Sequence, residues 1–491
     1  MALAVLSRVN SDLDRGEKNL VLHLLIIFRE DIESYWRKLG GCWEAVLIIG
    51  GAATFGGGEF KRSSLLRGEE MQTSFLASLI RRNRISTRLI AAIAVIAAIV
   101  AWGANSSAKP VIADIELLNA AEVELLTADY GLGLGYANIT PEEELRLSTL
   151  AHARGRCGGF EALPFDPVDP NHPLIANVFG EISSQNERNR RFHPSTHDFI
   201  EVVKKTEISE ALKKVMASNI HDTVKFLSAF PDREYSSTAP NKHIEGTKAR
   251  LTAMVVSSKL PATVDLVTHK GIRQKSIRVR VTGSTRPNEV IVLGGHLDSI
   301  NQEGGSGNEA PGADDNASGS GAIIEALRVV LGQRQPQRTI EFFLYAGEEG
   351  GLLGSGEIAA TYKKNKTDVV AVLQLDMIMY PGSGVLTISS ITDYTSSWLR
   401  SYLETVNALY LNAKIVNDQC GYACSDHASW YRQGYPTLVP FESKVKDMNH
   451  NLHTSRDVID EKSSFAHAAV FAKIAVIMAM DLGNSTLRAP K

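Results

Sequence analysis

Three absences narrow the function of this chain. Lys and Arg number 52 against 55 Asp and Glu, a net charge of -3, so the basic surface typical of nucleic-acid-binding domains is missing. Only Cys420 and Cys424 of the four cysteines are close in sequence, and no second pair or flanking histidine completes a structural zinc site. No convincing strand ends in a G-x-S-x-G elbow, and the adjacent residues 425–427 (Ser-Asp-His) cannot form a triad. We therefore expect no nucleic-acid partner and no serine hydrolase, and a peptide substrate fits the charge balance better than a polyanion.

Helix and strand patterns alternate from Ser209 onward. With 491 residues, 44% of them apolar, the chain can bury a large core. Helical patterns at 209–220 and 246–260 precede strand patterns at 276–284 and 290–297, and a long helix is predicted at 463–482. Apolar runs such as FFLYA and VVAVLQL lack polar alternation, which is typical of strands covered on both faces. The pattern predicts an α/β fold with a doubly wound, mainly parallel central sheet flanked by helices.

Residue types that bind metals follow the predicted strands. The run EVIVLGG leads into His296 and Asp298, TIEFFLYAG into Glu348 and Glu349, and VVAVLQL into Asp376. In an open α/β sheet, active sites form at the carboxyl ends of the strands. Two divalent cations need imidazole or carboxylate ligands on each, and one carboxylate between them to offset their repulsion. Two histidines and three carboxylates supply this set and leave one glutamate as a general base: His296, Asp314, Glu348, Glu349, Asp376 and His453.

Each of these residues also has a purely structural interpretation. The Asp-Asp-Asn turn at 314–316 can cap the helix predicted from ASGSGAIIEALRVVL, so that Asp315 or Asn316 caps while Asp314 faces the metals. The Glu pair at 348–349 is also typical of a solvated turn, although its place after a buried strand argues against this. His450 and His453 lie three residues apart, and either completes the ligand set. Ser425 is a candidate cap for a helix in SDHASWYRQG.

Six motifs in a fixed order are more specific than any single residue. GGHLDS, PGADDNASG, AGEEGGLLGS, LQLDM, CGYACSDHASW and LHTSRD follow one another within a stretch that runs from about Ile220 to the C-terminus. In this order they resemble the secreted bacterial leucyl aminopeptidases, a family of co-catalytic di-zinc exopeptidases. The resemblance implies the zinc-exopeptidase type of α/β fold and two Zn²⁺ ions per catalytic domain. It also implies peptide substrates with a free N-terminus.

The resemblance assigns a role to each candidate ligand. Asp314 is the bridging carboxylate, in a strained Asp314-Asp315 segment, and Glu348 is the general base. Asp298 orients His296 through the second ring nitrogen of that histidine. LHTSRD selects His453 over His450. The remaining zinc ligands are terminal: His296, Glu349, Asp376 and His453.

A substrate pocket with a disulfide in its wall is implied in the same way. Cys420 and Cys424 form the disulfide. Three pocket positions depart from the larger or aromatic residues of the family, which predicts a roomier pocket: Val439, Val445 and Met448. The complete implied pocket consists of Met377, Ile391, Tyr422, Val439, Phe441, Val445, Met448 and Leu452.

The expected activity is that of a monomeric, secreted zinc aminopeptidase that removes hydrophobic, leucine-like N-terminal residues. A zinc-bound water loses its proton to Glu348, attacks the scissile carbonyl, and Glu348 returns the proton to the leaving amine. Two alternatives share the scaffold: a glutaminyl cyclase-like acyltransferase with one zinc, and a non-catalytic binding ectodomain that has lost ligands.

The residues before the catalytic pattern divide into three parts. Residues 1–70 form an upstream extension without a clear role. Residues 71–108 have the charged flank, apolar core and small-residue end of a signal peptide, and the uncharged stretch 89–108 makes a membrane anchor the alternative. Residues 109–205 are expected to be a prosegment that a processing protease removes, with an accessory domain as the alternative, and 206–491 the catalytic domain. We expect a secreted or periplasmic protein.

Overall fold

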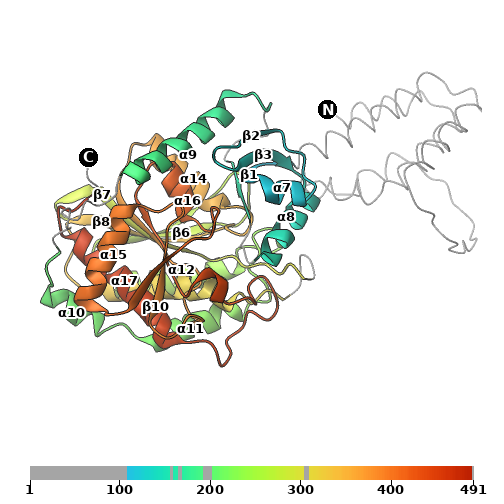
Figure 1. The fold of residues 1–491 in the computed structure, drawn as a ribbon. Coiled ribbons are helices and arrows are strands. Elements are labelled where there is room, and N and C mark those ends of the chain that lie inside the picture. The colour runs from blue at the N-terminus through green and yellow to red at the C-terminus, as the bar shows by residue number, and fades with distance from the viewer. Residues whose placement is uncertain (1–107, 155–158, 164–168, 192–201, 304–308, 489–491) are drawn as a thin grey trace, which may run out of the picture. The chain divides into compact units, whose positions relative to one another are not determined.

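A six-stranded mixed sheet forms the centre of the molecule (Figure 1), in the strand order β12-β9-β7-β8-β6-β5. The first four of these strands run parallel to one another, whereas β6 and β5 are antiparallel to their neighbours. The expected α/β fold is therefore confirmed, with one antiparallel edge. The strands are β5 Ala262–Val267, β6 Ser276–Val281, β7 Arg286–His296, β8 Arg338–Tyr345, β9 Asp368–Gln374 and β12 Thr437–Leu438.

Helices cover both faces of this sheet because its strands bury side chains on both sides. All eight residues of β8 are buried. Ile340 and Phe342 pack in one cluster with α11 (Ala217–Ser228), α13 (Gly319–Leu331) and α17 (Phe465–Gly483). Phe343 and Tyr345 point the other way and pack with α14 (Leu353–Lys364) and α16 (His427–Arg432). The alternation follows from the two-residue period of a strand.

The structure is a computed structural model that describes residues 108–154, 159–163, 169–191, 202–303 and 309–488. The predicted upstream extension, residues 71–107 of the predicted signal segment, Cys42 and Cys157 lie outside these residues. Residues 109–491 form one unit by their contacts. Within the described residues, α17 is long and apolar enough to cross a membrane by length and composition, and 78% of its apolar window is buried in the protein.

The other elements of the catalytic part complete the layers. The helix predicted at 209–220 is in fact two helices, α10 (Thr206–Leu212) and α11. Buried Glu325 explains the break, because its carboxylate accepts hydrogen bonds from the Met216 N–H and the Asn219 amide where α11 starts. The remaining elements are α12 Lys242–Ser257, α15 Ser397–Tyr410, and a small sheet of β10 Thr387–Ile391, β11 Lys414–Asp418 and β13 Pro440–Phe441.

Residues 109–191 form a small module with a core of its own, here called the N-terminal module. A four-stranded sheet in the order β2-β3-β1-β4 carries helices α7, α8 and α9. Helix α8 is capped at its start, because Thr140 and Glu143 exchange the hydrogen bonds of a capping box. Helix α9 continues through a polar stretch and ends at Arg191. The elements are β1 Lys109–Asp114, α7 Ile115–Ala120, β2 Thr127–Asp129, β3 Leu134–Ile139, α8 Pro141–Ala153, β4 Phe160–Ala162 and α9 Pro173–Arg191.

The N-terminal module packs against the loop that follows β8. The Ala162 N–H donates to the Gly351 carbonyl at 2.9 Å, and the Lys109 ammonium donates to the Gly350 carbonyl at 2.9 Å. Gly351 has a φ of +96°, and a Cβ there would lie 2.6 Å from the Phe160 ring. This loop begins with the candidate site residues Glu348 and Glu349, so the module contacts the edge of the sheet where the candidate site residues are expected.

Candidate active site

The candidate ligands gather at one edge of the central sheet because three neighbouring strands are parallel. His296 is the last residue of β7, Glu348 and Glu349 follow β8 by three and four residues, and Asp376 follows β9 by two. Since β9, β7 and β8 are adjacent in the sheet, their carboxyl ends lie side by side. The candidate residues therefore lie together at the edge of the sheet where the sequence analysis placed them.

Two groups of ligand-type residues share one aspartate, and that aspartate is Asp315. Its Oδ1 lies 3.1 Å from Nε2 of His296, and its Oδ2 lies 3.1 Å from Nε2 of His453. His296 also lies 3.3 Å from Oδ1 of Asp376, and His453 lies 2.8 Å from Oε2 of Glu349. One group is thus His296, Asp315 and Asp376, and the other is Asp315, Glu349 and His453.

The prediction that Asp314 bridges the two groups is wrong. The Asp314 carboxylate points elsewhere, where it accepts hydrogen bonds from the Met379 N–H, the Ser318 hydroxyl and the Asn449 amide. The strained peptide also lies one residue further along, because the cis bond joins Asp315 and Asn316.

The path of the backbone through this turn decides which aspartate faces the groups. Asp457 accepts hydrogen bonds from the N–H groups of both Asp314 and Asp315 and so fixes the two residues. The Asn316 side chain then accepts the Gly319 N–H, so Asn316 caps α13, as one of the two sequence-based alternatives expected.

The donor set fits two divalent cations. Nε2 of His296, both carboxylate oxygens of Glu349 and Oδ1 of Asp376 are buried and make no hydrogen bond within the described part of the chain. Buried polar atoms without hydrogen bonds are costly unless another ligand satisfies them. Imidazole nitrogens and carboxylate oxygens are ligands that zinc accepts, and a carboxylate with one oxygen toward each group suits a pair of cations.

The electrostatics of the cluster also favour a cation. Burial raises the pKa of Glu348 well above its ordinary value, with Glu349 and Asp376 adding to the effect. Burial likewise raises the pKa of Glu349 to about 7. Burial opposes protonation of His453, but the carboxylates of Glu349 and Asp315 outweigh it and raise the pKa of His453 to about 10. Without positive charge from outside, the cluster therefore retains protons that a metal would displace.

Glu348 is close to the two groups but belongs to neither. Its Oε2 lies 4.0 Å from Nε2 of His296, and the residue is only 5% exposed. Its carboxylate thus lies beside the ligands without being one of them, which is the position that the sequence analysis assigned to a general base.

Asp298 holds three residues of the site at once. Its Oδ1 lies 3.4 Å from Nδ1 of His296, which agrees with the predicted orienting role. In addition, its two carboxylate oxygens accept the N–H groups of Glu348 and Glu349 at 3.1 and 3.0 Å. The side chain therefore couples the ends of β7 and β8, a second role that the sequence did not predict.

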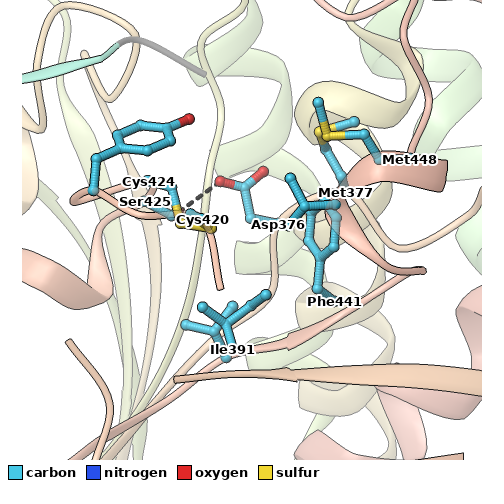
Figure 2. A pocket seen from close by; sticks show the side chains of 11 residues that line it. Asp376, Met377, Ile391, Cys420, Cys424, Ser425, Phe441 and Met448 are labelled. Carbon is cyan, nitrogen blue, oxygen red and sulfur yellow. Dashed lines mark hydrogen bonds between the residues drawn. A yellow bond between two sulfur atoms is a disulfide. The ribbon is translucent and has the colours of Figure 1, made fainter. Parts of the chain in front are cut away.

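Two further residues support the site and were not predicted to do so. The Ser425 hydroxyl donates to Oδ2 of Asp376 at 2.6 Å (Figure 2), so its expected role as a helix cap is wrong. Arg233 is buried and donates to the carbonyls of Leu297 and Gly312 at 2.7 and 2.8 Å. Arg233 thus ties the loop after His296 to the turn before Asp315. No pattern in the sequence marks either contact, because both partners come from distant segments.

An apolar pocket opens beside Asp376 (Figure 2), with a cavity of about 30 Å³. The predicted disulfide between Cys420 and Cys424 is present in its wall. The small cavity does not support the expectation of a roomier pocket. Leu452, one of the eight predicted pocket residues, does not line the cavity but packs in the same apolar cluster. The other seven line it: Met377, Ile391, Tyr422, Val439, Phe441, Val445 and Met448.

His450 lies outside both ligand groups. Its side chain is exposed, and its Nε2 lies 3.2 Å from the Lys446 carbonyl. His453, in contrast, is buried between Asp315 and Glu349. The geometry therefore agrees with the selection of His453.

Comparisons with known proteins cover the same residues. Residues 276–478 match the model of peptidase family M28. A probable aminopeptidase of Saccharomyces cerevisiae is 36% identical over 293 residues, which cover 58% of this chain and 78% of that protein. Leucine aminopeptidase 1 of Penicillium rubens is 37% identical over 289 residues, which cover 56% of this chain and 73% of that protein. The family match includes every residue of the two ligand groups.

The similarity to a solved structure extends beyond the catalytic part. The crystal structure of the LapA aminopeptidase of Legionella pneumophila has a TM-score of 0.67 and 25% identity, and covers 77% of this chain and 99% of that chain. Of 491 residues, 77% is about 378, whereas residues 206–491 number 286. The solved chain therefore has a counterpart to residues that precede position 206.

Proposed function

Because this chain belongs to peptidase family M28 and is an aminopeptidase, we propose that it is a two-zinc enzyme for hydrophobic, leucine-like N-terminal residues. One observation carries the proposal: two buried ligand groups share Asp315, and an apolar pocket opens beside Asp376 of the first group. The pocket would take the N-terminal side chain while the scissile bond lies at the ligand groups.

The residues divide into metal ligands and acid-base residues. His296, Asp315 and Asp376 would hold one zinc ion, and Asp315, Glu349 and His453 the other. When bound, the ions supply Lewis-acid polarisation of the substrate carbonyl and positive charge to offset the buried carboxylates.

Glu348 performs the proton transfers in this proposal. Its carboxylate accepts a proton from the attacking water and returns it to the amine of the leaving peptide. Burial raises the pKa of Glu348, and positive charge in the neighbouring groups would keep the carboxylate ionised and able to accept a proton. Asp298 holds the Glu348 N–H, and this bond keeps the carboxylate at the edge of the first group.

The pocket supports a preference for leucine-like side chains. Its walls are mostly apolar, so a charged side chain would lose its hydration without gaining a partner. A leucine side chain needs more room than about 30 Å³, and the flexible side chains of Met377 and Met448 can provide it by changing rotamer.

The test is a profile of aminoacyl anilides combined with metal analysis. Leucine and phenylalanine anilides should be hydrolysed much faster than lysine and aspartate anilides. Chelation should abolish the activity, and elemental analysis should find two zinc ions per chain. A single zinc ion with release of cyclised N-terminal glutamine would favour the glutaminyl cyclase alternative. A chain that binds peptides without hydrolysing any of them would favour the binding ectodomain.

We also propose that residues 109–205 restrain the enzyme as a prosegment. Their contacts with Gly350 and Gly351 support this, because they touch the loop that carries Glu348. Lys205 pairs with Asp481 of α17 at 2.6 Å, and this ion pair holds the lysine on the catalytic part. A processing protease would therefore cut before this lysine rather than after it. Secretion after cleavage within 71–108, or anchoring through 89–108, stays a prediction about residues outside the described ranges.

A further inference from the structure

A second, larger cleft adjoins the substrate pocket. It has a volume of about 800 Å³, and Val445 lines both spaces. The volume lies in the range typical of sites for small organic ligands. Its lining combines the N-terminal module with three loops of the catalytic part: Ala153, Arg154, Asp418, Gln419, Lys444, Val445, Lys446, His450 and Leu452.

Positive charge predominates in this cleft. Arg154, Lys444 and Lys446 line it, and none of the three forms an ion pair with a described residue. Asp418 is the acidic residue of the lining, and its Oδ2 accepts the Val445 N–H. Three cations and one carboxylate leave an excess of positive charge that a ligand carboxylate would balance.

The cleft is also joined to the catalytic edge. Leu452, in its wall, precedes the candidate ligand His453, and Gln419 precedes the pocket residue Cys420. The His453 carbonyl accepts the Gln302 N–H at 2.9 Å, and the Gln302 amide donates to the Ser148 hydroxyl on α8. The C-terminal end of α8, which carries Arg154 just beyond it, therefore lies against the loop of a candidate ligand.

We propose that this cleft binds the part of the peptide beyond the cleaved bond and selects peptides that carry a carboxylate there. The inference rests on the proposed function, in which the apolar pocket takes the N-terminal side chain. The rest of the peptide continues from the ligand groups, and the cleft wall at Leu452 is adjacent in sequence to His453 of the second group. Two or three extended residues span about 7–10 Å, so a carboxylate that close to the cleaved bond would enter the cleft. Arg154 and Lys446 are its binding residues, so the selection belongs to the chain that retains the N-terminal module and would weaken once the module is removed.

The carboxylate has two sources, the C-terminus of a short peptide or an acidic side chain, and two substrate pairs separate them. Leu-Gly-Gly is compared with Leu-Gly-Gly amide, and Leu-Gly-Asp amide with Leu-Gly-Asn amide. The full chain, loaded with zinc, is assayed for kcat/KM at low ionic strength beside Arg154→Gln, Lys446→Gln and the double variant. Lys259→Gln is the matched control, because it removes one positive charge from an exposed residue far from the site. The neighbouring Ser258 contacts Leu331, which is at the end of α13 opposite the site.

The unaltered chain should favour the carboxylate member of at least one pair by about three- to tenfold, the range of one or two partly exposed charged contacts. The preference should shrink in each single variant, vanish in the double variant and persist in Lys259→Gln. The pair that shows it identifies the source.

Equal rates within both pairs, or a preference that survives the double substitution, would overturn the inference while leaving the aminopeptidase intact. If the zinc-loaded chain hydrolysed neither the peptides nor leucine anilide, both before and after cutting between α9 and Lys205, the proposed function would fail and this inference with it.

Discussion

The substitution of either of two adjacent aspartates provides the sharpest test of the site. Asp315→Asn and Asp314→Asn are the same chemical change one residue apart. Each replaces a carboxylate oxygen with an amide group that cannot bind a cation. Only Asp315 has an oxygen toward each ligand group, at 3.1 Å from His296 and 3.1 Å from His453. The structure therefore predicts opposite results for metal binding.

The expected magnitudes follow from these contacts. Loss of a partner that merely orients a ligand weakens metal affinity by about 10–100-fold. Asp315 is a ligand in both groups, so Asp315→Asn should weaken the binding of at least one ion by about 100-fold or more, about 2.7 kcal/mol. In Asp314→Asn the new amide no longer accepts from the Met379 N–H or the Asn449 amide, but it can donate to the Glu442 carboxyl that Asp314 contacts. The change should therefore cost at most about 1–3 kcal/mol of folding stability, and both ions should remain.

The assay is zinc content by elemental analysis after dialysis against a zinc buffer, combined with melting temperature with and without zinc. Asp315→Asn should retain at most one ion and lose most of the stabilisation by zinc. Asp314→Asn should melt earlier than the unaltered chain but still bind two ions and respond to zinc. Two ions in Asp315→Asn together with metal loss in Asp314→Asn would refute the geometric assignment and restore the sequence-based one.

Three other predictions follow from the same site. Glu348→Gln should keep both ions and lower kcat by about 10²–10⁴-fold, whereas Glu349→Gln should lower zinc content itself; near-normal turnover of a zinc-replete Glu348→Gln chain would contradict the base assignment. His453→Ala should reduce zinc content and His450→Ala should not, and the reverse result would move the ligand. Brief proteolysis between α9 and Lys205 should speed hydrolysis of leucine anilide if the N-terminal module restrains the enzyme, and full activity before cutting would favour an accessory domain.

Much of the fold was predictable because its central strands are long apolar runs. Strands that are covered on both faces need apolar residues at consecutive positions, and β8 and β9 have them. The antiparallel pairing of β6 with β8 was not predictable, since it depends on which strand lies next to which in space. The helix break before Met216 likewise depends on Glu325, more than 100 residues away in sequence.

The site was predictable in residue type and less so in detail. His296, Glu349 and Asp376 lie at or just after the ends of strands that the sequence pattern predicts. The carboxyl ends of neighbouring parallel strands meet at one edge of a sheet, so the pattern also predicts that these residues converge. Asp314 and Asp315 have the same chemistry, and their side chains diverge because Asp457 holds both N–H groups from a loop about 140 residues further along. Hydrogen bonds to a distant residue decide which of these two adjacent aspartates faces the ligand groups. The local sequence pattern therefore does not show which one it is.

We have proposed that the N-terminal module restrains the enzyme and that its Arg154 helps to select substrates, and experiments can separate these two effects. Its strand β4 packs on the Gly350–Gly351 loop, and Glu161 pairs with Arg432 of α16 at 2.7 Å, with both side chains buried. Mutation of Glu161 alone would leave a buried guanidinium without its partner, which is costly, whereas removal of the whole module would return Arg432 to water. Cutting the chain is therefore the cleaner perturbation of this interface. If cutting accelerates leucine anilide and at the same time lowers the preference for a downstream carboxylate, then the module both restrains the enzyme and selects its substrates, because Arg154 leaves with it.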